Sequence, residues 1–208
     1  MNVTVDKSAR TQVPILSYIA ERWSPRAFQE KPVEREKIIA LLEAARWAPS
    51  ARNFQPWRFI LTTRSEAEGY QRLLGCLSER NQRWAQHAPV LLLVAAEVET
   101  NGSPNRTALY DTGLAVGTLT VQATASGLVL RQMGGFDRDR ARAVFQIPAN
   151  CEPVCVLAIG YRGDPGLLPD DLREGDLAPR TRRPLGEMVF SRIWGHAASM
   201  VNGKSRQR

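Results

Sequence analysis

Arginine is the residue type in this sequence whose number and spacing most clearly suggest chemistry. The 208-residue chain has 28 Lys and Arg, only four of them lysines, and a formal net charge of +7. Arg22 and Arg26 flank Ser24, and a second cluster, Arg-Thr-Arg-Arg-Pro, occupies residues 180–184. A planar guanidinium binds phosphate or carboxylate through paired N–H donors, so each of the two clusters would suit a phosphate. For any single arginine, including Arg52 between them, a solvated surface position is the alternative.

Two adjacent glycines and several absent motifs narrow the chemistry further. Gly134 and Gly135 follow a predicted strand and precede a predicted helix, so their backbone permits a flat ligand to approach closely, although such a pair also forms simple turns. The sequence has no Gly-x-Gly-x-x-Gly motif and no Walker motif, which argues against the common dinucleotide-binding and P-loop folds. With only two histidines in the chain, neither a Ser-His-Asp triad nor a histidine metal site is expected.

The rest of the composition is that of a globular protein without metal, membrane or nucleic-acid signatures. Cys76, Cys151 and Cys155 lack the spacing of metal ligands and are predicted to be buried thiols. The arginines are separated by acidic or apolar residues, unlike the dense basic runs with interleaved aromatics of a nucleic-acid groove. The longest apolar run, residues 88–96, is far shorter than the ~20 residues of a membrane helix, and residues 1–10 do not resemble a secretory signal. We therefore expect a cytoplasmic protein that binds neither nucleic acid nor membrane.

A mixture of helices and strands must position these candidate residues. Apolar periodicity and helix-breaking residues predict helices at residues 14–21, 34–48, 66–85 with a soft interruption at Gly75, 107–126 and 137–145. Alternating or continuous apolar runs predict strands at residues 57–63, 89–96, 129–133 and 153–161. Residues 49–56, which begin and end with proline, are predicted to form an ordered loop. Long helices around only about four strands favour an α+β fold over a doubly wound sheet.

The longest predicted helix, residues 107–126, carries a motif of small residues. Gly113 and Gly117 are four positions apart, a spacing that would let a neighbouring helix of a soluble protein approach closely. Gly127 then closes the helix as a C-terminal cap. The face predicted to be buried consists of Leu109, Thr112, Val116, Leu119 and Ala123.

We expect one domain with extensions at both ends. Residues 1–12 form an N-terminal extension, residues 13–199 a single domain and residues 200–208 a flexible tail. Within the domain, residues 162–184 have no periodicity and are predicted to form an extended arm, followed by a short element at residues 185–190. Because such an arm would have no core to cover in its own chain, it favours a homodimer in which the arms are exchanged.

Two motifs resemble those of the FMN-dependent nitroreductase family. The first is Arg-Trp-Ser-Pro-Arg-Ala-Phe at residues 22–28, and the second, more specific one is Ala-Pro-Ser-Ala-Arg-Asn-Phe-Gln-Pro-Trp at residues 48–57. The resemblance continues through Asn81, Gly-Gly-Phe-Asp at residues 134–137 and Pro-Arg-Thr-Arg-Arg-Pro at residues 179–184. It implies an α+β fold with a central, mainly antiparallel sheet of about four strands flanked by helices. It also implies a homodimer with two FMN sites at the subunit interface.

The resemblance assigns one group of residues to the phosphate end of FMN. These residues would contact the phosphate, the ribityl chain and the pyrimidine edge of the cofactor: Arg22, Trp23, Ser24, Arg26, Arg180 and Arg182. In that position the guanidinium groups would neutralise a phosphate dianion.

A second group of residues is implied to surround the isoalloxazine ring. The partner subunit would lay a loop against the ring, formed by residues matching Pro49, Ser50, Ala51 and Asn53. Asn81 would bond the pyrimidine edge, and the backbone N–H groups at Gly134 and Gly135 would approach flavin N5. Gly135 would thus orient the cofactor, and no side chain is needed as an acid or nucleophile. Where some relatives carry a basic residue near a flavin carbonyl this chain has Trp84, which leaves Arg26 to balance the charge of reduced flavin.

The leading hypothesis is an oxidoreductase in which NAD(P)H reduces FMN. An electron-poor small molecule, such as a nitroaromatic or a quinone, would then occupy the same flavin face in a ping-pong mechanism. A second hypothesis is another flavin reaction on the same fold: ene reduction, dehalogenation or flavin breakdown. A third is a basic protein that binds flavin or nucleic acid without turnover.

Overall fold

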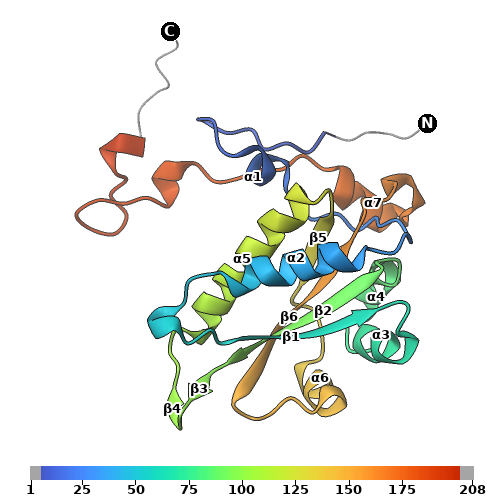
Figure 1. The fold of residues 1–208 in the computed structure, drawn as a ribbon. Coiled ribbons are helices and arrows are strands. Elements are labelled where there is room, and N and C mark those ends of the chain that lie inside the picture. Colours follow the sequence, from blue (N-terminus) through green and yellow to red (C-terminus); the bar gives the residue numbers. More distant parts are fainter. Residues whose placement is uncertain (1–5, 202–208) are drawn as a thin grey trace.

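The centre of the computed structural model, which describes residues 6–201, is a four-stranded antiparallel sheet (Figure 1). The strand order is β1-β2-β6-β5, and every neighbouring pair is antiparallel. The strands are β1 (Trp57–Thr63), β2 (Val90–Glu97), β5 (Val129–Met133) and β6 (Cys151–Gly160). A separate two-stranded ribbon pairs β3 (Glu99–Thr100) with β4 (Ser103–Pro104). The predicted α+β class and the sheet of about four antiparallel strands are therefore confirmed.

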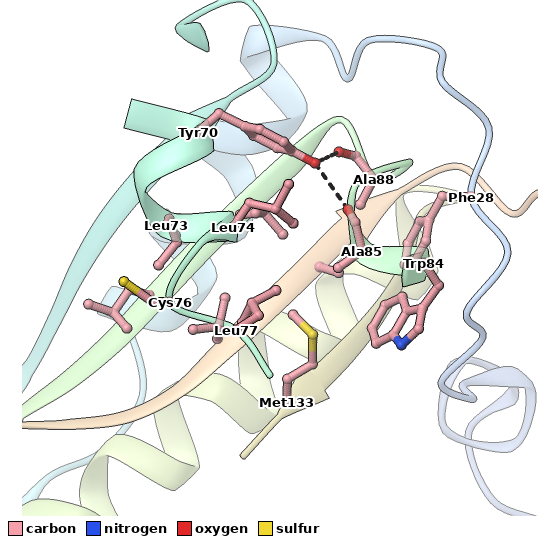
Figure 2. Close-up of a cluster of buried hydrophobic side chains, with 14 of the residues drawn as sticks. Phe28, Tyr70, Leu73, Leu74, Cys76, Leu77, Trp84, Ala85, Ala88 and Met133 are labelled. Carbon is pink, nitrogen blue, oxygen red and sulfur yellow. Dashed lines mark hydrogen bonds between the residues drawn. The ribbon is translucent and has the colours of Figure 1, made fainter. Parts of the chain in front are cut away.

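Helices cover both faces of the sheet, so β2 is buried on each side as its continuous apolar run predicted. On one face, α2 (Arg35–Arg46) and α5 (Ala108–Ala125) pack over Val90, Leu92 and Val94. On the other face, the alternate residues Leu91 and Leu93 join a cluster supplied by α3 (Ala67–Leu74), α4 (Glu79–Ala85) and α6 (Arg138–Phe145). Figure 2 shows the core of this second cluster, with the Tyr70 hydroxyl donating to the carbonyls of Ala85 and Ala88.

The interruption predicted at Gly75 within the helix at residues 66–85 is confirmed, but it is a complete break between two helices, α3 and α4, rather than a soft one. The backbone of residues 76–78 pairs with residues 135–137 instead of continuing the helix. Asp137 N donates to Cys76 O at 2.8 Å, and Ser78 N donates to Gly135 O at 3.0 Å. The break is thus imposed by a segment almost sixty residues away, and it sets the start of α4 against the Gly134-Gly135 segment.

The predicted extended arm, residues 162–184, is also wrong over its first half. Residues 165–167 form a short 3-10 turn, and α7 (Asp170–Leu177) follows it. Leu168 and Leu172 are buried in the same cluster as α3 and α4, so this segment covers a core in its own chain. From residue 178 onward the chain is extended, and beyond the turn Leu185–Glu187 it runs away from the body of the molecule, as Figure 1 shows in red. The turn Ser199–Val201 spans the boundary between the predicted domain and the predicted tail at residue 200, and residues 202–208 lie outside the described residues.

Most of the predicted buried face of α5 is confirmed, but Leu109 is 49% exposed. The buried face passes through Ala108, which lies about 100° around the helix from Leu109. Gly127 closes the helix with a φ of +72°, as predicted. The neighbouring helix expected at Gly113 and Gly117 is absent from the described chain, since nothing lies within 4 Å of a Cβ built at either position.

The other predicted elements are close to those observed. Helix α1 (Ser17–Glu21) is shorter than residues 14–21, and the loop at residues 49–56 contains one 3-10 turn, Ala51–Asn53. All three cysteines are free thiols, with Cys76 and Cys151 buried and Cys155 only half-buried in the single chain. Burial raises the pKa of each thiol, that of Cys155 to about 11.

Candidate functional site

Arg22 and the second arginine cluster, which begins 158 positions later in the sequence, meet around one cavity. Arg22 follows α1 directly, and Arg180 and Arg182 approach it from the segment after α7. The cavity has a volume of about 550 Å³. We call it the arginine cavity; its lining includes Arg10, Ile15, Ile19, Arg22, Arg180, Arg182, Arg183 and Leu185. Arg22 thus lies beside the second cluster, as the family resemblance implied, whereas Arg26 is not among the described residues that line the cavity. The binding of a phosphate there stays a prediction.

Three of these guanidinium groups lie close enough to repel one another. Burial lowers the pKa of Arg22, and the nearby charges of Arg180 and Arg182 lower it further. Within the described chain none of the three has a carboxylate partner, because their bonds go to a hydroxyl and to backbone carbonyls. Arg22 Nη1 donates to Ser24 Oγ at 3.1 Å, and Arg180 Nη1 donates to Ala20 O at 2.8 Å. Mutually repelling cations without an internal anion are the donor set expected of a site for an anionic ligand.

Arg26, predicted from the resemblance to balance flavin charge, already has an anionic partner in the structure. The carboxylate of Asp176 on α7 accepts from Arg26 Nη1 at 2.8 Å and from the Arg26 backbone N at 2.6 Å. The Asp176 side chain is 1% exposed and that of Arg26 is 17% exposed. The pair fastens α7 to the first arginine motif and neutralises the Arg26 charge. Trp23 of the same motif is buried, with Lys7 Nζ 5.3 Å from its ring centroid.

A further arginine, Arg131 on β5, lies between the first arginine motif and α4. Its Nη1 donates to the backbone carbonyl of Ser24, and its guanidinium carbon lies 5.6 Å from the ring centroid of Trp84. Trp84 is fully buried and stacks on Phe28 with ring centroids 6.2 Å apart (Figure 2). Trp84 Nε1 has no hydrogen-bond partner in the described chain. Trp84 is therefore a core residue whose outer face supports a cation.

Asn81 and Gly135, predicted to contact the flavin ring, are brought together by the break between α3 and α4. Asn81 Nδ2 donates to Gly135 O at 3.0 Å, so the side chain is engaged with the β5 end in this structure. Among the described residues no acceptor is bonded to the backbone N–H of Gly134 or of Gly135, and both glycines are exposed. These N–H groups remain available to a ligand.

The predicted ring-contacting loop, with Pro49, Ser50, Ala51 and Asn53, is held in an unusual backbone conformation. Arg52, Asn53 and Gln55 have φ values of 50°, 58° and 48°, a region that costs non-glycine residues free energy. Asp111 on α5 anchors the loop, because its Oδ2 accepts from Ala51 N at 3.1 Å and from Thr107 Oγ1 at 2.9 Å. A strained loop fixed by a buried carboxylate is typical of a functional segment.

This loop lies near one end of α5 and α1 lies near the other (Figure 1), and α1 contributes Ile19 to the lining of the arginine cavity. The loop is bonded to Asp111 in the first turn, whereas Thr124 and Gly127 at the other end line a second cavity, of about 540 Å³, together with Arg22. An 18-residue helix is about 27 Å long. The structure therefore brings the predicted site residues together in two groups and does not join the loop to the arginines within one chain.

Sequence reasoning missed three residues of this region: Asp111, Arg131 and Asp176. Asp111 and Asp176 are buried aspartates on helices. From sequence alone, an aspartate in a helix is predicted to be exposed to solvent unless its partner is known. Arg131 lies inside a short strand that the sequence predicts from its apolar residues. The interruption of that apolar pattern is the one sequence feature that could have marked it. Among residues 6–201 no group of three or more His, Cys, Asp or Glu side chains is arranged to hold a metal ion. Over the same range no helix combines the length and apolarity needed to cross a membrane.

Comparison with known proteins places the chain in a family. Its sequence matches the nitroreductase family over residues 19–161. A Streptomyces coelicolor protein, named as a candidate NADH dehydrogenase/NAD(P)H nitroreductase, is 31% identical over 160 residues, which are 67% of this chain and 78% of that protein. The chain thus belongs to the nitroreductase family and is an oxidoreductase.

Solved structures agree with this assignment. A crystal structure described as an oxidoreductase containing FMN has a TM-score of 0.86 and 35% sequence identity, and the alignment covers 90% of this chain and 96% of that one. A nitroreductase family protein from Clostridium difficile 630 has a TM-score of 0.69 and 28% identity, over 87% of this chain and 99% of the other. The resemblance inferred from the two motifs is confirmed.

Proposed function

We propose that this protein binds FMN and uses NAD(P)H to reduce electron-poor acceptors such as nitroaromatics or quinones. The observation that carries the proposal is the arginine cavity: Arg22, Arg180 and Arg182 converge there without a carboxylate partner in the described chain. A terminal phosphate dianion would relieve their mutual repulsion. The absence of a dinucleotide motif favours FMN over FAD.

The residues present fit FMN in their chemistry. The arginine cavity offers charge-assisted donors for the phosphate, and the Ser24 hydroxyl beside Arg22 adds a polar group for the ribityl chain. The exposed backbone N–H groups of Gly134 and Gly135 and the amide of Asn81 would face the ring. No acid, base or nucleophile is required of the protein, because FMN when bound accepts a hydride from the nicotinamide and passes electrons to the acceptor.

The same proposal includes a homodimer in which each site is built by both chains. The support is the separation of the two groups of site residues by the length of α5. The outer face of α5 is suited to a partner, because Leu109 and Tyr110 are exposed and open space surrounds Gly113 and Gly117. A second copy packed on this face would bring its Pro49–Asn53 loop toward the arginine cavity of the first.

The test begins with the visible absorption spectrum of the purified protein and identification of the released chromophore. We expect a flavin spectrum and FMN on release; release of FAD, or no flavin after reconstitution, would contradict the proposal. Initial rates with NADH and NADPH at several fixed acceptor concentrations then test the mechanism. Parallel double-reciprocal lines are expected if nicotinamide and acceptor take turns at one flavin face. Intersecting lines would show that both bind together.

A further inference from the structure

Arg131 is a cation near the candidate site to which the proposed function assigns no role. It lies near the middle of β5, where Arg131 pairs with Ala158 of β6, and two residues later the strand ends at Met133 before Gly134 and Gly135. Three residues of a strand span about 10 Å, so Arg131 lies within about 10 Å of Gly134 along the backbone. Its bond to Ser24 O places the guanidinium next to the first arginine motif as well.

The charge of Arg131 is not neutralised within the described chain. Its neighbour Arg26 takes the Asp176 carboxylate. Among residues 6–201, Arg131 has no carboxylate within 4.0 Å, and its only hydrogen bond goes to the backbone carbonyl of Ser24. Burial lowers the pKa of Arg131, the charges of Arg26 and Arg80 lower it further, and the more distant Asp176 opposes them. Partial burial of a guanidinium without an anionic partner costs free energy. A ligand that supplies the negative charge would offset this cost.

The rest of the guanidinium remains open to such a ligand. The buried polar atoms without partners in the described chain do not include any nitrogen of Arg131, so the nitrogens that make no hydrogen bond keep some exposure. The Trp84 ring beneath the guanidinium holds it in place, with its own position fixed by the stack on Phe28. Arg131 is thus held in place while some of its donors stay unused within the described chain.

We propose that Arg131 contacts the pyrimidine side of the flavin and stabilises its reduced form, an inference that rests on the proposed binding of FMN. When NAD(P)H transfers a hydride, two electrons and one proton move to flavin N5, NAD(P)⁺ leaves, and the flavin gains one negative charge. A fixed cation beside that charge binds reduced FMN more tightly than oxidised FMN. Arg131, rather than Arg26, then sets the reduction potential.

The experiment measures FMN affinity and midpoint potential separately in the full-length protein. In Arg131→Gln we expect the dissociation constant for oxidised FMN to change less than about threefold, since the phosphate site is intact. The preference for reduced over oxidised FMN should fall at least tenfold, which lowers the two-electron midpoint potential by about 30 mV. Arg131→Lys, which keeps the charge, should retain most of the wild-type potential.

A matched control removes an exposed arginine outside the sheet, at the start of α6. Arg138→Gln breaks an exposed pair with Glu152, which lies six residues, or about 20 Å, along β6 from Ala158. Its potential should equal that of the wild type, which shows that net charge alone is not responsible.

The outcomes separate this inference from the proposed function. If the wild type binds no FMN, both are overturned. If it binds FMN and the potential of Arg131→Gln is unchanged, only the role of Arg131 is overturned. Arg131→Met, which keeps an apolar contact with Trp84, replaces Arg131→Gln if that variant does not fold. Failure of both variants to fold would show a structural role and overturn the inference.

Discussion

Buried charges in this protein fall into two kinds at the scale of single residues. Arg26 is paired with Asp176, so its charge serves to join two segments. Arg22, Arg131 and Arg180 are partly buried and bond only to hydroxyl or carbonyl oxygens in the described chain. Because burying an unpaired cation costs free energy, the second kind points to binding and the first to stability.

Arg22→Ala should weaken FMN binding without unfolding the protein. A hydrogen bond to a charged group contributes roughly 1.5–3 kcal/mol, so the dissociation constant should rise about tenfold to one-hundredfold. Titration of the apoprotein with FMN in a calorimeter measures this directly. Arg138→Ala, on α6, serves as the control, and equal affinities in the two variants would remove Arg22 from the phosphate site.

Asp176→Asn should destabilise the fold because it leaves the Arg26 guanidinium without its anion. Loss of one partner of a buried pair costs about 3 kcal/mol in the free energy of unfolding, which urea denaturation measures. The control is Asp171→Asn on the same helix, whose exposed pair with Arg83 is screened by solvent and should contribute much less. A similar loss of unfolding free energy in both variants would show that the Arg26–Asp176 pair does not hold α7 in place.

Gly135→Ala should disturb the contact between α4 and the end of β5. A Cβ at this position would lie 3.0 Å from Asn81 Nδ2 and 3.3 Å from Ser78 Oγ, so the Asn81 side chain must shift. We expect slower flavin reduction by NAD(P)H in stopped-flow measurements while FMN remains bound. Gly69→Ala, where the nearest contact is an ordinary 3.6 Å, is the control. An unchanged reduction rate would argue against the role of Gly135.

At the scale of elements, the loop at residues 49–56 shows how a strained conformation is maintained. Three residues with positive φ are held because Asp111 accepts from Ala51 N and because Ser50 Oγ accepts from Gln55 N at 3.0 Å. The two hydrogen bonds offset the free-energy cost of the positive φ values. The loop is therefore held in one conformation, with its side chains in fixed positions.

Asp111→Ala should release this loop. The variant leaves Ala51 N–H without its acceptor, which costs about 1–3 kcal/mol, and the Thr107 hydroxyl keeps only Asn105 Oδ1 as an acceptor. Hydrogen exchange of the amides at residues 51–55 should accelerate, and FMN affinity should fall if the loop completes the partner's site. Asp139→Ala on α6 provides a control at an exposed acid. Unaltered exchange would show that the loop is stable without its anchor.

For the whole molecule, two of the exposed apolar regions lie where the proposed second copy would pack. The segment after residue 184 carries exposed side chains far from the core, including Trp194 at 89% exposure (Figure 1). The outer face of α5 adds Leu109 and Tyr110. Such surfaces are unfavourable in water, and their burial would stabilise a dimer.

Light scattering should therefore give about twice the chain mass of 23.2 kDa. A sharper test mixes Arg22→Ala with Asp111→Ala, because each homodimer should bind FMN weakly for a different reason. If each site uses the arginines of one chain and the loop of the other, exchange of subunits creates mixed dimers with one intact site. Recovery of tight FMN binding on mixing is the expected result. A monomer that still binds FMN, or no recovery in mixed dimers, would contradict the shared site.

The sequence by itself determined the strands, the long helix α5 and the two motifs of the family. These signals are local, because apolar periodicity and short motifs reflect neighbours within a few residues. The family resemblance also implies that Arg22 lies near the segment after α7, because it assigns both to the phosphate end of FMN.

Only the tertiary structure decided the break between α3 and α4, the helix α7 and the partners of the buried charges. The break depends on backbone pairing of residues 76–78 with residues 135–137, and α7 depends on Leu172 reaching a core formed by distant elements. Likewise, Asp176 rather than a ligand neutralises Arg26, whereas Arg131 is left with only a carbonyl oxygen. These features depend on which segments of the chain lie close together in space. The separation of two residues in the sequence does not give their distance in the folded chain.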